Sequence, residues 1–114
     1  MPKLISQKNF SNVVPVNKTT TTLTETVIDS FSKRTFQSAK YQIQVERGGN
    51  YQTTELLVVH DNLTTYMTEY GTIQTGDTLA SFTTDLSGSS IRLLATPTSA
   101  TETKFKVIRK AINA

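Results

Sequence analysis

Hydrophobic and polar residues alternate along residues 40–62, KYQIQVERGGNYQTTELLVVHDN. Polar residues separate Tyr41, Ile43 and Val45, and this period of two is typical of a β-strand with one buried and one solvated face. The next four residues, Arg47-Gly48-Gly49-Asn50, include two glycines, which adopt the positive φ that a tight turn requires. The pattern therefore predicts a β-hairpin with its turn at these glycines.

The second strand of this hairpin ends in four consecutive apolar residues, Leu56-Leu57-Val58-Val59. Apolar residues on both faces are typical of a central strand that is covered above and below. Asp61-Asn62 then gives a turn signal. We expect both faces of this strand to be buried. We also expect Glu55, just before the apolar run, to be a partly buried acid that pairs with a cation on a neighbouring strand, for example Arg92.

Further short segments of strand character follow one another along the chain. Turn signals separate them at intervals of roughly 8–12 residues, which is typical of a sandwich or barrel. Because the links are short, we expect neighbouring strands to pair as antiparallel hairpins. The sequence predicts an all-β antiparallel β-sandwich of about seven or eight strands, with Gly71 as a bulge or bend. Besides the hairpin, strands are expected at residues 24–36, 63–74, 79–85, 91–96 and 102–110.

The composition supports this fold class and excludes several kinds of chemistry. Threonine makes up roughly a fifth of the chain, and this β-branched residue favours the pleated surface of a strand. With 114 residues, the chain is long enough for one domain with a real core. It has no cysteine, which excludes disulfides and thiolate sites. There is neither an apolar run of about 18 residues nor a signal-peptide core, so we expect synthesis in a cytoplasm and no membrane contact.

Residues 1–22 differ from the rest and are expected to form an extended N-terminal arm that precedes a β-sandwich domain at residues 23–114. Pro15 blocks a helix and suits an extended path. A disordered terminus is one interpretation. The other is an arm that pairs with a sheet edge of a neighbouring subunit. Its subunit-interface anchors would be the apolar residues that a solvated tail does not need, which are Phe10, Val13, Val14 and Val16.

No pattern of catalytic or metal-binding residues stands out in the sequence. His60 is the only histidine, and its position at a strand end favours a structural hydrogen-bonding role. The nucleophile motif G-x-S-x-G is absent. The 9 acidic residues are scattered along the chain, and no pair is marked out for glycoside hydrolysis. We therefore predict that the protein is not an enzyme and uses no cofactor or metal.

The last strand is basic, with Lys104, Lys106, Arg109 and Lys110, although the formal net charge is only +3. Lysines on a strand commonly protect a sheet edge from aggregation. An electrostatic contact to an acidic neighbour in an assembly is the alternative. Nucleic-acid binding requires aromatic residues interleaved with the cations on an exposed face. The one aromatic residue here, Phe105, points inward by alternation, so nucleic acid is not an expected partner.

The tyrosines allow two interpretations. Tyrosine is an ordinary filler at the rim of a sandwich, and it is also a surface on which a sugar ring stacks. The chain contains no tryptophan, which favours the filler role. If a ligand surface exists, we expect it at Tyr66 and Tyr70 with neighbouring turn residues, and we expect a glycan as its ligand.

Several segments between residues 41 and 112 resemble a β-domain of virion structural proteins from marine bacteriophages, cyanophages in particular. They are YQIQV, TELLVVHD, the stretch from Tyr66 to Glu69-Tyr70-Gly71, SFTTDLSGSSIRLLATP and KVIRKAI. None of them is a catalytic signature, and residues 1–22 lie outside the resemblance. It implies a non-catalytic structural protein of the virion, either a capsid-decorating subunit or a tail or neck accessory subunit.

The same resemblance implies other virion proteins and copies of the chain itself as partners. It also implies a location in the virion after synthesis in the host cytoplasm. A module that recognises a glycan on the host surface is the alternative function.

Overall fold

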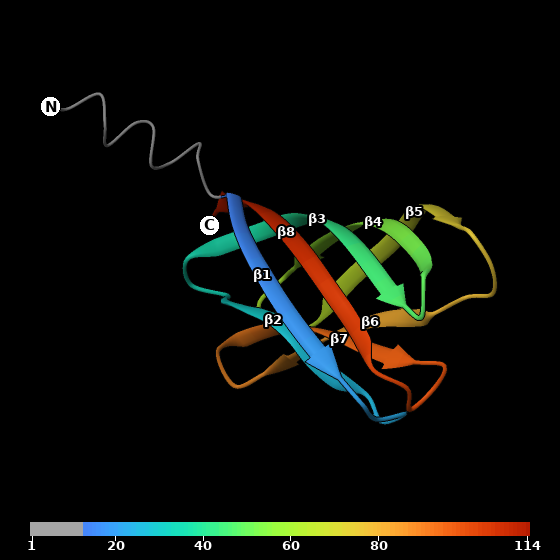
Figure 1. The fold of residues 1–114 in the computed structure, drawn as a ribbon. Helices are drawn as coiled ribbons and strands as arrows, with labels where there is room; N and C mark the ends of the chain where they lie inside the picture. Colours follow the sequence, from blue (N-terminus) through green and yellow to red (C-terminus); the bar gives the residue numbers. More distant parts are fainter. Residues whose placement is uncertain (1–12) are drawn as a thin grey trace, which may run out of the picture.

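The computed structural model describes residues 13–114, and this part of the chain consists of β-strands and connecting turns without a helix. The strands form a five-stranded sheet of order β1-β8-β3-β4-β5 and a three-stranded sheet of order β2-β7-β6. The two sheets face each other (Figure 1), which confirms the predicted all-β antiparallel sandwich. In the described range, no helix could span a membrane. The strands are β1 (Val13–Thr20), β2 (Thr26–Ser32), β3 (Phe36–Arg47), β4 (Asn50–His60), β5 (Thr65–Gln74), β6 (Ala80–Ser87), β7 (Ser90–Pro97) and β8 (Thr103–Asn113).

The predicted hairpin is formed by β3 and β4. Arg47 lies opposite Asn50 in the antiparallel ladder, so Gly48 and Gly49 alone make the turn. Their φ angles are 54° and 84°, and positive φ at both central positions is the type I′ geometry that matches the twist of two strands. The turn after β4 is also confirmed, with Asn62 at a φ of 70°.

The pairing of the other strands differs in part from the expectation of sequential hairpins. Neighbours in sequence pair at β3–β4, β4–β5 and β6–β7. By contrast, β8 lies between β1 and β3, and β2 pairs with β7. The reason is that the links before and after β2, after β5 and after β7 cross from one sheet to the other. A short link in this chain therefore does not always make a hairpin.

The described part of the expected N-terminal arm is a strand of the chain's own sheet. Strand β1 pairs with β8 from Val13 opposite Lys110 to Thr20 opposite Thr103. Val16 packs against the core and Thr20 is buried, because alternate residues of this strand face inward. The sheet thus begins before the boundary expected at residue 23. Phe10 and the side chain of Val13 lie outside what the structure describes.

The core fills the space between the two sheets. Phe82 on β6 and Phe105 on β8 meet edge to face across it, with ring centroids 6.4 Å apart. This geometry adds to the stabilisation that comes from burying the rings themselves. The largest fully buried apolar side chains are Tyr41, Phe105, Ile43, Leu56, Ile91 and Leu93.

Two polar side chains join the sheets at the end of the sandwich near the β3–β4 turn. The buried amide of Gln52 accepts a hydrogen bond from Leu79 N–H at 2.7 Å and donates one to the Ala80 carbonyl at 3.1 Å. Arg47 donates to the Leu79 carbonyl and to Thr103 Oγ1, both at 2.9 Å. These contacts satisfy backbone groups that enter the core at the start of β6.

Candidate interaction surface

The outer face of the five-stranded sheet, on the side away from the three-stranded sheet, is not covered by any described part of the chain. Strand β4 was expected to be buried on both faces. Leu56 and Val58 are buried as expected, but Leu57 and Val59 on the outer face are 48% and 44% exposed. The expectation is wrong for this face, because only the inner face meets another layer. The apolar run at residues 56–59 therefore supplies one core surface and one surface in contact with water.

Large apolar side chains gather on this outer face. They come from three of its five strands, β4, β5 and β8, and alternate with inward-facing residues. Between 43% and 73% of each side chain's surface is exposed. Large apolar patches on a soluble domain usually mark an interaction site. The residues are Tyr51, Leu57, Val59, Tyr66, Ile73, Ile108 and Ile112.

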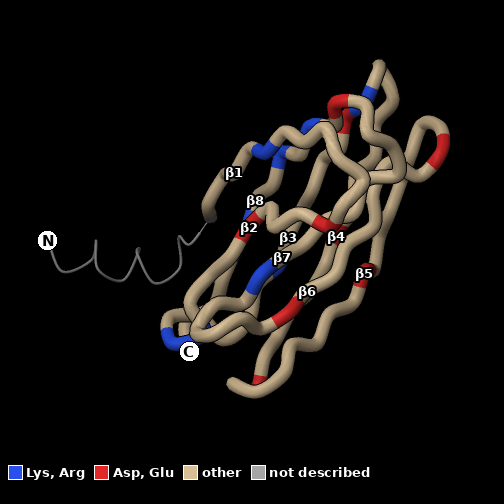
Figure 2. The backbone as a smooth tube through the Cα atoms, turned by 90° about the horizontal axis from the view of Figure 1, so that it is seen from below, with Lys and Arg blue, Asp and Glu red and all other residues tan. Residues whose placement is uncertain are grey.

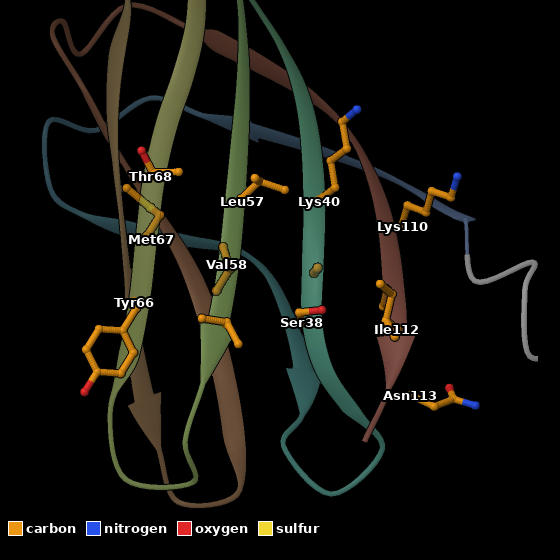
Figure 3. A pocket seen from close by; sticks show the side chains of 13 residues that line it. Ser38, Lys40, Leu57, Val58, Tyr66, Met67, Thr68, Lys110, Ile112 and Asn113 are labelled. Carbon is orange, nitrogen blue, oxygen red and sulfur yellow. The ribbon is translucent and has the colours of Figure 1, made fainter.

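The outer face is hollowed at the end near the β4–β5 turn. The hollow has a volume of about 1050 Å³ and spans β5, β4, β3 and β8. Figure 3 shows Tyr66 at one side, Lys40 and Lys110 at the opposite side, and Leu57 between them. Ile112 lines the hollow at its β8 side. The surface thus combines an apolar floor with an aromatic ring and two ammonium groups at its borders.

A smaller hollow, of about 210 Å³, lies at the other end of the outer face. Tyr51 on β4 and Ile73 on β5 line it together with Gln44 and Thr53. This second hollow has no charged residue among those that line it. The apolar character of the outer face therefore extends along the β4–β5 pair from one end to the other.

The charged residues of the outer face lie mainly on β8 and β3. Lys40 lies opposite Lys110 in the ladder, and its Nζ is 3.9 Å from Glu55 Oε2. Glu55 is partly buried and pairs with a cation on a neighbouring strand, as expected, but this cation is Lys40 on β3 and not Arg92. Arg92 lies in the other sheet and donates to both carboxylate oxygens of Asp85, at 2.7 and 2.6 Å.

The alternation expected for β8 is confirmed. Phe105 and Val107 are buried, whereas Lys104, Lys106 and Lys110 are exposed. Lys and Arg residues gather around β1 and β8 in Figure 2, while β5 carries one acidic residue and no basic one. Among the described residues, positive charge therefore borders the outer face on the side of β3 and β8.

The two tyrosines expected at a ligand surface are placed differently. Tyr66 is 55% exposed, lines the large hollow and donates a hydrogen bond to Asp61 Oδ2 at 3.4 Å. Tyr70 is also exposed but is not among the residues that line the hollow. It lies in a β-bulge, which confirms the irregularity expected at Gly71, since Gly71 pairs with Glu55 while the next ladder pair is formed by Glu69.

Asp61 itself is held by the turn. Its Oδ1 accepts hydrogen bonds from the backbone N–H groups of Thr64 at 2.8 Å and of Leu63 at 3.0 Å. These two bonds favour the ionised form, so the pKa of Asp61 lies below its usual value. The carboxylate therefore serves to fix the β4–β5 turn beside the hollow.

His60 has a structural role, as expected from the sequence. Its ring is buried at the end of β4. Asn62 N–H donates to Nδ1 at 3.0 Å, so Nε2 carries the proton and donates to the Phe36 carbonyl at 2.7 Å. Both ring nitrogens are therefore engaged. No group of His, Asp and Glu side chains that could hold a metal ion occurs within residues 13–114.

A buried charged cluster that sequence reasoning missed joins the two sheets near the β2 side. Arg109 Nη1 lies 2.9 Å from Asp29 Oδ2, which also accepts a hydrogen bond from the Tyr41 hydroxyl at 2.7 Å. Burial raises the pKa of Tyr41, and the neighbouring Asp29 carboxylate raises it further. The only signal in the sequence was the interruption of an apolar strand by Asp29. The cluster lies between the sheets and is a structural element of the core boundary.

Comparisons with known proteins support the fold. No protein-family model matches the chain, and no curated protein sequence matches it. A solved tailspike protein of Acinetobacter phage vB_ApiP_P1 has a similar structure, with a TM-score of 0.60 and 15% sequence identity. The match covers 90% of this chain but only 22% of the tailspike chain. The tailspike protein of Acinetobacter baumannii phage AM24 also matches, with a TM-score of 0.46, 9% identity and coverage of 90% and 27%.

The first of these matches establishes that the sandwich fold also occurs within a much longer phage tailspike protein. This tailspike protein comes from a phage of Acinetobacter. The marine or cyanophage type implied by the sequence resemblance therefore stays a prediction.

Proposed function

We propose that this chain is a non-catalytic structural module of a phage particle, associated with the tail, that binds another virion protein or a further copy of itself through its outer face. The observation that carries the proposal is the row of half-exposed apolar side chains on that face. The phage context comes from the sequence resemblance and from the fold shared with a phage tailspike protein. That neighbour favours a tail position over capsid decoration.

The energetics favour coverage of the outer face by a partner. Full burial of a Leu, Ile or Val side chain is worth about 1.5–3 kcal/mol. Leu57, Ile108 and Ile112 each keep roughly half or more of their surface in water. The exposed Lys40–Glu55 pair on the same face contributes less, because exposed ion pairs are worth about 0.2–1 kcal/mol. A partner that covers this face therefore binds mainly through apolar contact, with the lysines of β8 setting its orientation.

The N-terminal segment provides a second proposed contact between subunits. In this proposal, Phe10, which lies outside the described residues, contacts a neighbouring subunit. Val13, Val14 and Val16 serve the same contact if β1 exchanges between subunits and pairs with β8 of a neighbour in place of its own. Strand exchange of this kind keeps every contact of the closed domain and adds a link between copies.

The test combines location and surface mutation. Antibodies raised against the purified domain are used for immuno-electron microscopy of particles of the phage that encodes it. Label at one fixed place on the tail supports the proposal, and domain found only in the soluble fraction of the lysate contradicts it. In the same phage, Leu57→Lys with Ile112→Lys should prevent incorporation. Ser81→Lys, on the exposed side of β6, is the matched control and should leave incorporation unchanged.

A host-surface glycan-binding module is the second candidate, and it has one specific observation in its favour. The half-exposed ring of Tyr66 borders the large hollow, where a sugar ring could stack on it. Binding of the purified domain to host surface polysaccharide should then be lost in Tyr66→Ala and kept in Tyr70→Ala. Equal binding by both variants would reject a stacking site at Tyr66.

A further inference from the structure

Strand β5 is the least covered strand of the sandwich. All of its residues except Thr65 and Met67 are exposed, although alternate residues point to the inner side. The strand is the last of the five-stranded sheet, so one of its edges has no ladder partner among residues 13–114. A strand with two exposed faces and a free edge gains little stability from its own domain. Its free edge is a template for pairing with another chain.

The other three edge strands of the two sheets are shorter than β5 in the part of the chain that the structure describes. Strand β1 carries Pro15 and Lys18, and both residue types protect an edge. Strand β2 contains a bulge at Ile28, as β5 does at Tyr70. Strand β6 is shorter than β5 and carries Asp85. Strand β5 contains neither Pro, Lys nor Arg, and Glu69 is its one charged residue.

The bulge at Tyr70 changes which residues of β5 face outward. Before the bulge, Tyr66 and Thr68 pair with the outer-face residues Val59 and Leu57 of β4. After it, Gly71 and Ile73 pair with Glu55 and Thr53, which also belong to the outer face. The outward positions are therefore even-numbered in the first half of the strand and odd-numbered in the second half.

This change makes β5 complementary to itself in one antiparallel register. Residues that face each other in an antiparallel pair point to the same side of the sheet. If Tyr66 lies opposite the partner's Ile73, then Thr68 lies opposite the partner's Gly71, and all four positions are outward. In the same register, the inward Met67 lies opposite the partner's Thr72. A strand without the bulge would place outward residues opposite inward ones.

We propose that β5 binds β5 of a second copy of this chain, edge to edge and antiparallel, about a two-fold axis between Glu69 and Tyr70. Tyr66 and Ile73, the two most exposed large apolar residues of β5, then form an aromatic and β-branched pair with the partner's Ile73 and the partner's Tyr66. Pairs of this type stabilise antiparallel strands. Glu69 lies opposite the partner's Tyr70, so the two acids do not face each other.

The pairing joins the two five-stranded sheets into one continuous sheet, and the two outer faces become a single surface. The inference rests on the proposed structural role and adds to it the identity of one partner and the edge that binds it. A contact of this kind is isologous and closes at two copies. It leaves the outer faces free for a different virion protein.

The first test is the mass in solution, measured by light scattering on a sizing column over a range of concentrations. The intact chain should have twice its chain mass of 12.6 kDa. Ile73→Lys should halve the measured mass, because it places a charge at the centre of each side-chain pair. Asn17→Lys, at the exposed edge strand β1, is the matched control and should leave the mass unchanged. Circular dichroism verifies that both variants are folded.

The second test fixes the register by cross-linking, which the absence of cysteine in the chain makes clean. Tyr66→Cys combined with Ile73→Cys should give a covalent dimer on oxidation. Each single variant should not, because equivalent residues of the two copies are then about 23 Å apart along the strands. A monomer at every concentration, a dimer that Ile73→Lys leaves intact, or single variants that cross-link as well as the double variant would each overturn the proposal.

The two proposals fail in different ways. If the chain is monomeric in solution and Ile73→Lys enters phage particles as the unchanged chain does, the β5 contact is rejected and the structural role stands. If the chain forms the cross-linked dimer but is absent from particles, the virion role is rejected and the β5 contact stands.

Discussion

Arg109 on β8 and Asp29 on β2 form an ion pair of 2.9 Å between the two sheets, and their side chains are only 11% and 7% exposed. Arg109 also donates to the Ser30 carbonyl at 2.8 Å and lies 5.8 Å from the ring centres of both Phe31 and Phe36. The guanidinium is thus held by a carboxylate, a carbonyl and two aromatic faces. This arrangement compensates for the removal of two charges from water.

Removal of one partner of this pair should destabilise the domain strongly. Asp29→Ala leaves the Arg109 charge buried without its carboxylate, and changes of this type cost about 3–5 kcal/mol. Asp85→Ala breaks a more exposed pair with Arg92 and should cost less than about 1 kcal/mol. Urea unfolding followed by circular dichroism measures both. Similar losses of unfolding free energy in the two variants would show that the buried pair stabilises the domain no more than the exposed pair does.

The same cluster predicts a loss of stability in alkaline solution. The pKa of Tyr41 in the folded chain is raised, first by burial and then by Asp29, above the value of about 10 for an unfolded tyrosine. Above pH 10 the unfolded chain releases this proton and the folded chain keeps it. The free energy of unfolding should therefore fall as the pH rises past 10, by up to about 1.4 kcal/mol per pH unit for this group.

Tyr41→Phe provides the control for this effect. It removes the hydroxyl that donates to Asp29, so it should lower stability at neutral pH by about 1 kcal/mol. In this variant, the free energy of unfolding should also fall less steeply above pH 10, because the unfolded chain then releases one proton fewer. Urea unfolding between pH 7 and pH 11 compares the two chains. Parallel curves would place the alkaline sensitivity in other groups.

Truncation at two positions distinguishes β1 from the segment before it. A chain that begins at Val13 keeps all of the β1–β8 ladder that the structure describes and should unfold at the same temperature as the intact chain. A chain that begins at Leu23 lacks β1, loses the packing of Val16 and uncovers an edge of β8. We expect a clearly lower unfolding temperature or aggregation. Thermal unfolding followed by circular dichroism measures both chains. Equal unfolding temperatures for the two truncated chains would contradict a structural role of β1.

Two glycines should respond in opposite ways to the same substitution. Gly49 has a φ of 84°, a region in which a Cβ atom costs about 1–2 kcal/mol, so Gly49→Ala should destabilise the β3–β4 turn. Gly71 does not have a positive φ of this kind, and a Cβ built on it meets no atom within 4 Å. Gly71→Ala should be neutral or stabilise by up to about 1 kcal/mol. Thermal unfolding measures both, and a loss at Gly71 comparable to that at Gly49 would refute the distinction.

The sequence by itself determined the features that depend on neighbouring residues. The alternation at Tyr41, Ile43 and Val45 and the two glycines after Arg47 were enough for the β3–β4 hairpin, because strand period and turn geometry are local properties. The inward and outward residues of β8, the bulge near Gly71 and the structural role of His60 followed in the same way. The fold class came from the repetition of such segments.

Only the tertiary structure decided which faces and edges meet. Leu57 and Val59 are as apolar as Leu56 and Val58, so no local pattern could tell that one pair is covered and the other is not. The order of the strands in each sheet also cannot be read from a local pattern. Strand β8 lies between β1 and β3 because of long-range packing, and this packing also brings Arg109 to Asp29 across the sandwich. The candidate interaction surface and the free edge of β5 depend on these long-range contacts, and burial in a sandwich is a property of its layers and not of a single strand.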